Sequence, residues 1–75
     1  MEVCKNPEQD RITRMVEDYS DLLLRLALHH VSELATAEDV VQTTFLRCMT
    51  NSPVFESAAH ERAWLIRTAI NLCND

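Results

Sequence analysis

The sequence predicts an all-α fold, a small three-helix bundle that forms a single domain over residues 1–75. Apolar residues recur at three- and four-residue spacing in three segments, as on amphipathic helices. The chain has no glycine and two prolines, which disfavours tight hairpins and glycine-rich loops. Its 47% hydrophobic and 25% charged residues are a globular composition. We expect helices over about 7–30, 37–50 and 58–75, with room for a short extra helical turn at the N-terminus.

The first predicted helix starts at a capping signal. Asn6 can cap it, Pro7 occupies the first position, where a missing N–H costs nothing, and Gln9 can close a capping box. Leu24 and Leu28 lie off its apolar stripe. The stripe itself consists of Ile12, Met15, Val16, Tyr19, Leu22, Leu23, Leu26, Ala27 and His30.

The second predicted helix follows a link over about 31–35. Thr36 can cap it, and Asp39 would then stand at the third helical position, where the helix dipole favours an acid. Leu46 is an apolar residue in polar company on its outer face. The expected outer residues are Asp39, Gln42, Thr43, Leu46 and Thr50, and the expected buried ones are Ala37, Val40, Val41, Thr44, Phe45 and Cys48.

The third predicted helix begins at Ser57 or a few residues later, after Asn51-Ser52-Pro53 ends the second. Its apolar pattern reaches the last residues without a stop, so we expect the chain to be an excised domain cut inside a helix. Its apolar face would hold Leu65, Ile66, Ala69, Leu72 and Cys73. Its polar face would hold the only tryptophan. The residues of this face are Trp64, Arg67, Thr68, Asn71 and Asn74.

The charge distribution limits the function. A net charge of −5 counts against nonspecific nucleic-acid binding, which needs local lysine and arginine. All the surplus acid, however, lies in residues 1–56, whereas 57–75 hold Arg62 and Arg67 against Glu61 and Asp75. The third helix can therefore still approach DNA.

Catalytic and metal-binding patterns have little support. The sequence offers no recognisable nucleophile beside a base, no paired acids in an apolar setting and no phosphate loop. We expect a non-enzyme without cofactor or metal. Its N-terminus lacks the parts of a signal peptide, and no apolar run approaches the roughly 20 residues of a membrane span, so we expect a cytoplasmic protein without membrane insertion. Neither the cysteines nor the histidines have the spacing of a disulfide framework or a zinc site: Cys4, Cys48, Cys73, His29, His30 and His60.

Three stretches carry a family resemblance: AEDVVQTTFLRC, then PVFES, then AWLIRTAINLCND. In this order and spacing they resemble domain 2 of the extracytoplasmic-function (ECF) sigma factors, alternative specificity subunits of bacterial RNA polymerase. The resemblance covers about residues 12–75. It implies a transcription-initiation domain that binds core RNA polymerase and recognises and melts the minus-ten promoter element. It also implies a further domain, sigma domain 4, that this sequence does not contain.

The resemblance assigns two surfaces. The first would dock on the clamp helices of the polymerase's largest subunit, through Asp39, Gln42, Thr43 and Leu46. Thr43 stands where many members have an acid, so one charged contact would be missing or replaced. The second would bind single-stranded promoter DNA. In it a loop captures a flipped base with Phe55, Glu56, Ser57 and Ala58, where Ser57 replaces a frequent glycine, and Trp64 abuts the melted duplex.

Side-chain chemistry fits the DNA roles independently. An exposed indole such as Trp64 can replace lost base stacking, worth about 1–3 kcal/mol per base. Arg67 can neutralise a phosphate and Asn71 can hydrogen-bond a base edge, with Thr68 on the same face. Each also has a plain structural alternative. Trp64 can pack under the loop at 53–55, Phe55 can plug the bundle end, Arg67 and Asn71 can be ordinary solvated residues, and Asp39 can serve the helix alone.

Two other functions remain open. One is a helical protein-interaction module without DNA readout, for example one that binds an anti-sigma factor, with Leu24, Leu28 and Leu46 as docking points. The other is a repressor that reads duplex DNA through a helix-turn-helix. That reading is weaker, because a recognition helix would carry several basic residues and the third helix has only Arg62 and Arg67.

Overall fold

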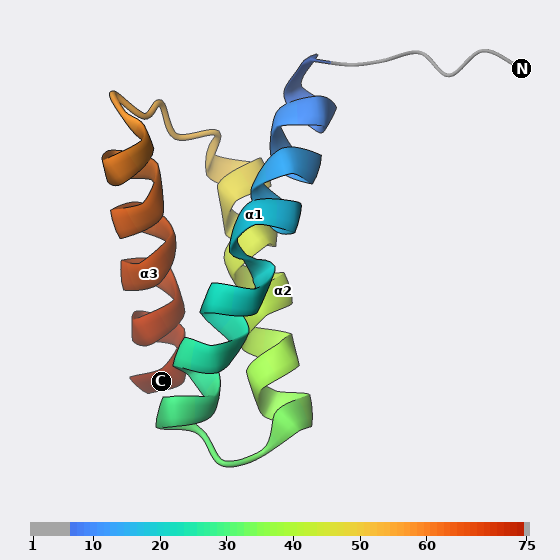
Figure 1. Cartoon of the computed structure of the whole chain (residues 1–75), viewed down its shortest axis with the longest axis vertical. Helices are drawn as coiled ribbons and strands as arrows, with labels where there is room; N and C mark the ends of the chain where they lie inside the picture. The colour runs from blue at the N-terminus through green and yellow to red at the C-terminus, as the bar shows by residue number, and fades with distance from the viewer. Residues whose placement is uncertain (1–6, 75) are drawn as a thin grey trace, which may run out of the picture.

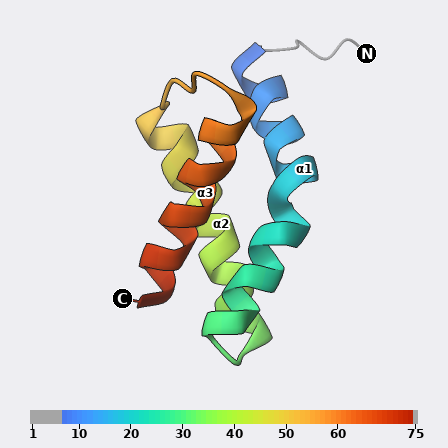
Figure 2. The same ribbon diagram turned by 60° about the vertical axis from the view of Figure 1, so that its left-hand side comes forward.

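The computed structural model describes residues 7–74, which form three α-helices: α1 (Pro7–His30), α2 (Leu34–Asn51) and α3 (Ala58–Asn74). α1 and α2 run in opposite directions, and α3 packs against both (Figure 1). The view in Figure 2 brings α3 to the front, with its first turns beside the loop that leaves α2. The described residues contain no strand, and the all-α prediction is confirmed.

The core lies where the three helices meet. Every residue that the sequence assigned to the buried face of α2 is buried, including the polar Thr44, whose hydroxyl donates to the Val40 carbonyl oxygen at 2.8 Å. This hydrogen bond satisfies a group that would otherwise be costly to bury. The buried apolar residues are Met15, Leu23, Ala27, Ala37, Val40, Val41, Phe45, Cys48, Leu65 and Ala69.

The buried residues of α1 differ in part from the apolar stripe that the sequence predicts. The helix has the expected bounds, but His30 is exposed at its end and 36% of Val16 is exposed, so neither is a core residue. Leu24, expected off the stripe, packs partly against the core. Leu24 is covered because α2 and α3 both pack against α1, and together they cover a wider arc of it than one stripe.

The start of α2 differs from the prediction. The helix begins at Leu34, with Glu33 in an extended conformation as the N-cap and the Ala37 N–H donating to the Glu33 carbonyl oxygen at 3.0 Å. Thr36 is therefore a helical residue rather than the cap, and its hydroxyl bonds to the Glu33 carboxylate at 3.0 Å. Asp39 lies beyond the first turn, so the predicted stabilisation of the helix start by its charge is wrong.

The structure does not describe residues 1–6 and 75. The predicted Asn6 cap and the short extra N-terminal turn lie outside the described residues, as do Cys4 and Asp75. α3 begins directly after Ser57, as expected, and continues to Asn74. None of the helices described over residues 7–74 is long and apolar enough to cross a membrane.

Candidate nucleic-acid interface

The loop between α2 and α3 begins with a left-handed residue. Ser52 has φ 46° and ψ 53°, and its N–H donates to the Cys48 carbonyl oxygen at 3.0 Å, which closes the C-terminus of α2. Its hydroxyl also bonds to the Met49 carbonyl oxygen at 3.2 Å. The left-handed conformation followed by Pro53 ends the helix and turns the chain toward α1.

α1 holds this loop from one side. The Arg11 guanidinium donates to the Pro53 carbonyl oxygen at 3.1 Å, and its carbon lies 5.6 Å from the centre of the Phe55 ring. The ring and the guanidinium are close enough for a cation–π contact. One arginine thus fixes both the backbone and the aromatic side chain of the loop.

α3 holds the loop from the other side. Ser57 caps the helix, because its hydroxyl accepts the His60 N–H at 3.1 Å while its carbonyl oxygen accepts the Glu61 N–H at 3.0 Å. The His60 side chain reaches back, and its Nδ1 accepts the Glu56 N–H at 3.2 Å. This is a variant of the capping box, in which a third helical residue returns a hydrogen bond to the chain before the cap.

Trp64 is half-buried rather than fully exposed. Its indole meets the Phe55 ring at 5.9 Å between centres and an interplanar angle of 65°, and Phe55 meets the His60 ring edge-on at 5.4 Å and 89°. The alternative in which Trp64 packs under the loop is therefore confirmed. Phe55 is also half-buried at this end of the bundle.

Glu61 is buried, with 6% of its surface exposed, although it carries an ionisable side chain. Tyr19 Oη donates to its Oε1 at 3.2 Å, and an Arg14 guanidinium nitrogen lies 3.5 Å from its Oε2. Burial, and next the hydrogen bond to Glu61, raise the pKa of Tyr19 above its usual value. The three side chains tie α1 to the first turn of α3.

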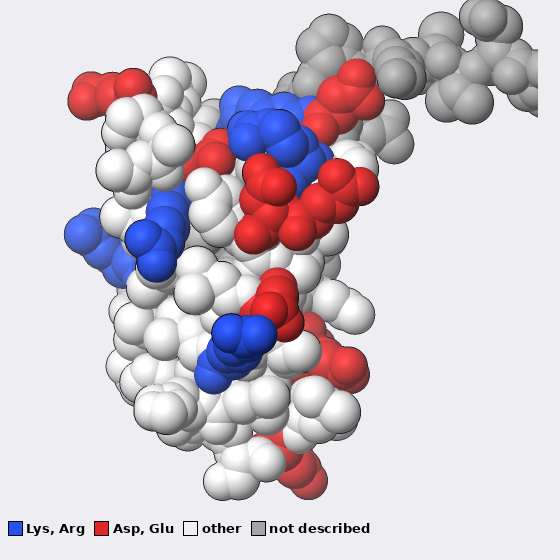
Figure 3. Space-filling model, viewed as in Figure 1, with Lys and Arg blue, Asp and Glu red and all other residues white. Residues whose placement is uncertain are grey.

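The burial of Glu61 changes the charge that α3 presents. Over residues 58–74 the remaining charged side chains are Arg62 and Arg67, and both are exposed. Figure 3 shows basic atoms over α3, whereas basic and acidic atoms are mixed over α1. On α1 two acids pair with arginines, Arg14–Asp18 at 3.4 Å and Arg25–Asp21 at 3.1 Å. An acidic chain thus has a basic outer surface on α3.

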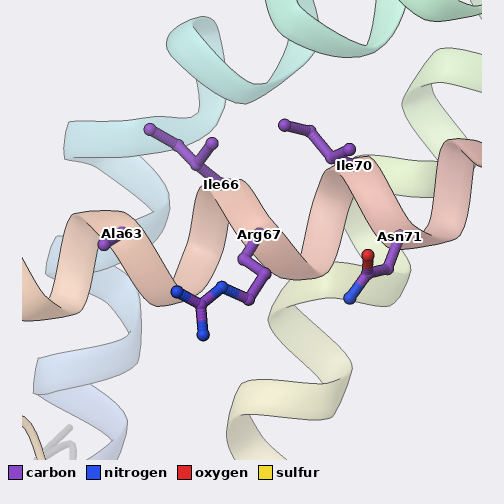
Figure 4. A pocket seen from close by; sticks show the side chains of 5 residues that line it. All are labelled: Ala63, Ile66, Arg67, Ile70 and Asn71. Carbon is purple, nitrogen blue, oxygen red and sulfur yellow. The ribbon is translucent and has the colours of Figure 1, made fainter.

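Arg67 and Asn71 are exposed and line a shallow concavity of about 400 Å³ on α3. Figure 4 shows both extending to one side of the helix, with Ile66 and Ile70 on the other. Thr68, expected on the polar face, is half-buried. A guanidinium and an amide beside apolar groups can together contact the phosphate, edge and flat face of a nucleotide.

The four loop residues that the resemblance assigned to base capture separate into two groups. Phe55 turns toward Arg11 and Trp64, whereas Glu56, Ser57 and Ala58 are exposed. Ser57 already uses its hydroxyl to cap α3. Glu56, Ser57 and Ala58 are therefore accessible to a ligand, whereas Phe55 is only partly so.

The second predicted surface lies on α2. Asp39, Gln42 and Leu46 are exposed, with 58% of Leu46 accessible, and Thr43 is half-buried. Gln42 and Leu46 also line a groove of about 330 Å³ between α1 and α2. The other lining residues of this groove are Ile12, Val16, Ser20, Val41, Phe45 and Met49.

Several residues of these surfaces escaped the sequence interpretation. Met49 is 51% exposed, three residues after Leu46, and Ile70 lies three residues after Arg67. Both are apolar residues off the core stripe, which is the signal that singled out Leu46. Arg11 and His60 had no such signal, because their partners in the loop are defined only by the packing of the helices.

Metal and thiol chemistry find no site in the described part of the chain. Within residues 7–74 no three His, Cys, Asp or Glu side chains are grouped so that they could hold a metal ion. Cys48 is a core residue, and burial raises the pKa of the Cys73 thiol, which disfavours the reactive thiolate.

Comparison with known proteins agrees with this geometry. Residues 15–75 match the family model described as sigma-70 region 2. The ECF RNA polymerase sigma factor BldN of Streptomyces coelicolor is 36% identical over 69 residues, which are 91% of this chain and 26% of that protein. SigW of Bacillus subtilis is 31% identical over 71 residues, which are 95% of this chain and 38% of SigW. SigL of Mycobacterium tuberculosis is 37% identical over 62 residues, or 81% and 35% of the two chains.

The chain thus spans between about a quarter and two fifths of the length of these curated relatives. No solved structure matches the chain at the level of similarity required of these relatives. The predicted resemblance to domain 2 of an ECF sigma factor is confirmed, and sigma factors are not a family of enzymes. By its match over residues 15–75 and its three-helix fold, the chain belongs to the sigma-70 region 2 family.

Proposed function

We propose that this chain acts in transcription initiation as the domain of an ECF sigma factor that binds core RNA polymerase and recognises and melts the minus-ten promoter element. The observation that carries the DNA part is the surface shared by the loop and α3. There Trp64, Arg67 and Asn71 lie within two turns on a helix whose exposed charges, over residues 58–74, are basic. The chain would carry out this function in the cytoplasm.

The surface suits single-stranded rather than double-stranded DNA. Duplex readers place several basic residues of one helix in the major groove, but α3 exposes only Arg62 and Arg67. An unstacked base needs a flat apolar partner, which the accessible part of Trp64 supplies. Arg67 would then contact the backbone, and Asn71 would donate to and accept from a base edge.

The loop would hold a base flipped out of the stack. Arg11 and His60 fix its backbone at Pro53 and Glu56, so the loop has a defined shape before DNA arrives. A preformed site avoids the entropy cost of ordering on binding. Phe55 would form the floor of this site, and Glu56, Ser57 and Ala58 would contact the base or its sugar, with Thr68 supporting Trp64 from the next turn.

The polymerase would bind the outer surface of α2. Asp39, Gln42, Thr43 and Leu46 would contact the clamp helices of the largest subunit, and the groove beside Gln42 and Leu46 would accept apolar side chains. The exposed Leu46 and Met49 make this the most apolar accessible surface on α2. A helical partner fits such a surface, because a helix places apolar groups at regular intervals along a groove.

The alternative is a helical interaction module without DNA readout, for example one that binds an anti-sigma factor. The matches to sigma-70 region 2 and to ECF sigma factors do not favour it. The two candidates differ in what they expect of α3. A pure interaction module needs no DNA affinity there, whereas a sigma domain does.

Binding of labelled oligonucleotides, followed by fluorescence anisotropy, tests the DNA part. We expect a single-stranded minus-ten oligonucleotide to bind better than the same sequence as a duplex. Trp64→Ala should weaken that binding by roughly five- to tenfold, the equivalent of one lost stacking contact of about 1–1.4 kcal/mol. Arg25→Ala is a control outside the proposed interface and should bind like the wild-type chain, because Arg25 is exposed on α1 and pairs with Asp21.

Two results would count against the proposal. Equal affinity for random and minus-ten single strands would remove base readout. Equal binding by the wild-type chain and Trp64→Ala would remove the indole from the interface and would favour the interaction module.

A further inference from the structure

We propose that His60 is a positioning residue for the loop before α3, and that it holds this loop only while its imidazole is uncharged. The consequence for DNA rests on the proposed function, but the contact does not. We name the four residues Arg11, Phe55, Glu56 and His60 the loop latch.

The geometry of the latch ties it to one protonation state. The Glu56 N–H points to His60 Nδ1, with 3.2 Å between the two nitrogens. A ring nitrogen that accepts a hydrogen bond carries no proton, so this contact requires a neutral imidazole with its proton on Nε2. A second proton would have to go onto Nδ1 itself. Protonation of His60 and the hydrogen bond from Glu56 therefore exclude each other.

Loss of that hydrogen bond would affect the whole loop. Glu56 immediately precedes Ser57, the cap of α3, and immediately follows Phe55. The Phe55 ring packs between the His60 ring at 5.4 Å and the Trp64 indole at 5.9 Å. A His60 that turned away would thus release the Glu56 backbone and remove one wall of the aromatic cluster. The exposed loop residues would lose their fixed position relative to Trp64.

The charged groups around the latch do not compensate. From α1, Arg11 lies over the Phe55 ring at 5.6 Å and carries a positive charge, so it cannot attract an imidazolium. From α3, the neighbouring Glu61 is already bonded to Tyr19 and Arg14. The Glu56 carboxylate of the loop is exposed and can attract an imidazolium, but this cannot restore a hydrogen bond from the backbone amide.

The sign of the effect separates the latch from ordinary electrostatics. Protonation of histidines makes a chain of net charge −5 less negative, so general attraction predicts tighter DNA binding as the pH falls. The latch predicts the opposite. Binding to a single-stranded minus-ten oligonucleotide should be weaker at pH 5.5 than at pH 8.

A measurement without DNA tests the contact. In an NMR titration of the 75-residue chain, the Glu56 amide signal should move with the same midpoint as the His60 ring signals. In His60→Asn the side-chain oxygen can accept the same hydrogen bond and does not titrate, so the Glu56 signal should stay in place. A Glu56 amide that ignores the protonation of His60 in the wild-type chain would overturn the proposal.

DNA binding at constant ionic strength tests the consequence. The wild-type chain should bind about fivefold more weakly at pH 5.5 than at pH 8, a change of the size of one lost capping contact. His60→Asn should bind equally at both pH values, and His60→Ala weakly at both. The control is the double variant His29→Asn, His30→Asn, which changes exposed histidines at the far end of α1 and should keep the wild-type decline.

The two failures are distinguishable. If no variant binds the oligonucleotide at any pH, the proposed function fails while the NMR titration still decides the latch. If the Glu56 signal follows His60 but wild-type affinity rises as the pH falls, His60 does not position the loop for DNA, and the positioning role is overturned.

Discussion

The hydrogen bond from Tyr19 Oη to Glu61 Oε1, at 3.2 Å, joins the middle of α1 to the first turn of α3. Tyr19→Phe removes the hydroxyl and keeps the ring. Glu61 would then retain only Arg14, whose side chain is 56% exposed and whose nearest nitrogen is 3.5 Å away. A carboxylate that is 6% exposed would lose its closest donor.

The expected cost follows from this geometry. Hydrogen bonds to charged groups contribute about 1.5–3 kcal/mol to stability. The 3.2 Å separation is long for a hydroxyl donor, and the solvated Arg14 remains, so we expect the lower end of the range, about 1.5 kcal/mol. For a domain of this size such a loss lowers Tm by roughly 6–12 °C.

Urea unfolding followed by circular dichroism measures this loss. The midpoint should fall while the slope of free energy against urea stays constant, because the folded surface is unchanged. Glu61→Gln with and without Tyr19→Phe completes a double-mutant cycle that isolates the pair. Wild-type stability in Tyr19→Phe would refute the reasoning, since the buried carboxylate would then not depend on the tyrosine.

The same variant has a pH signature. Burial and the hydrogen bond to Glu61 raise the pKa of Tyr19 above 10.0, so folding favours the neutral phenol. This contribution to stability is complete below the unfolded-state pKa and is lost as the pH rises through the higher folded-state pKa. The stability gap between the wild-type chain and Tyr19→Phe should therefore narrow above about pH 10.

Two further predictions concern α2. Leu46→Asp should abolish binding to isolated polymerase clamp helices with unchanged circular dichroism, whereas Leu34→Asp, at a residue that is 54% exposed, should bind normally; loss of helicity in Leu46→Asp would show instead that Leu46 belongs to the core. Ser52→Gly should stabilise the chain by about 0.5–1 kcal/mol in urea unfolding, because glycine adopts the left-handed conformation at φ 46° without a steric cost. A destabilised Ser52→Gly would mean that the bond from the Ser52 hydroxyl to Met49 outweighs that relief.

The helices and their buried faces follow from local spacing. All the residues expected in the core from α2 are buried, and Leu65 and Ala69 of α3 are buried as well. This part succeeds because three- and four-residue periodicity is a property of one helix alone. The capping signal predicted the wrong start for α2. Thr36 and Asp39 read as a helix start, but Glu33 adopts the extended conformation that allows the helix to begin one turn earlier.

The family resemblance assigned residues to both candidate surfaces, and it rested on residue order rather than on periodicity. It did not predict how the residues of the candidate DNA surface pack. Trp64 and Phe55 pack together at the bundle end, while Arg67 and Asn71 remain fully available on α3. An aromatic residue on a polar helix face can either be exposed or be covered by a loop, and the sequence pattern does not distinguish between these two cases.

By itself, then, the sequence determined three helices, the apolar side of each and the family to which their order belongs. Only the tertiary structure decided the partners of the polar side chains. Tyr19 meets Glu61 and Arg11 meets Pro53 across 42 residues of chain in each case, and these contacts turn an acidic sequence into a fold with a basic α3 and a fixed loop. The reason is that such pairs depend on the axial offset between packed helices. The same apolar stripes allow several offsets, and each offset would bring different polar side chains together.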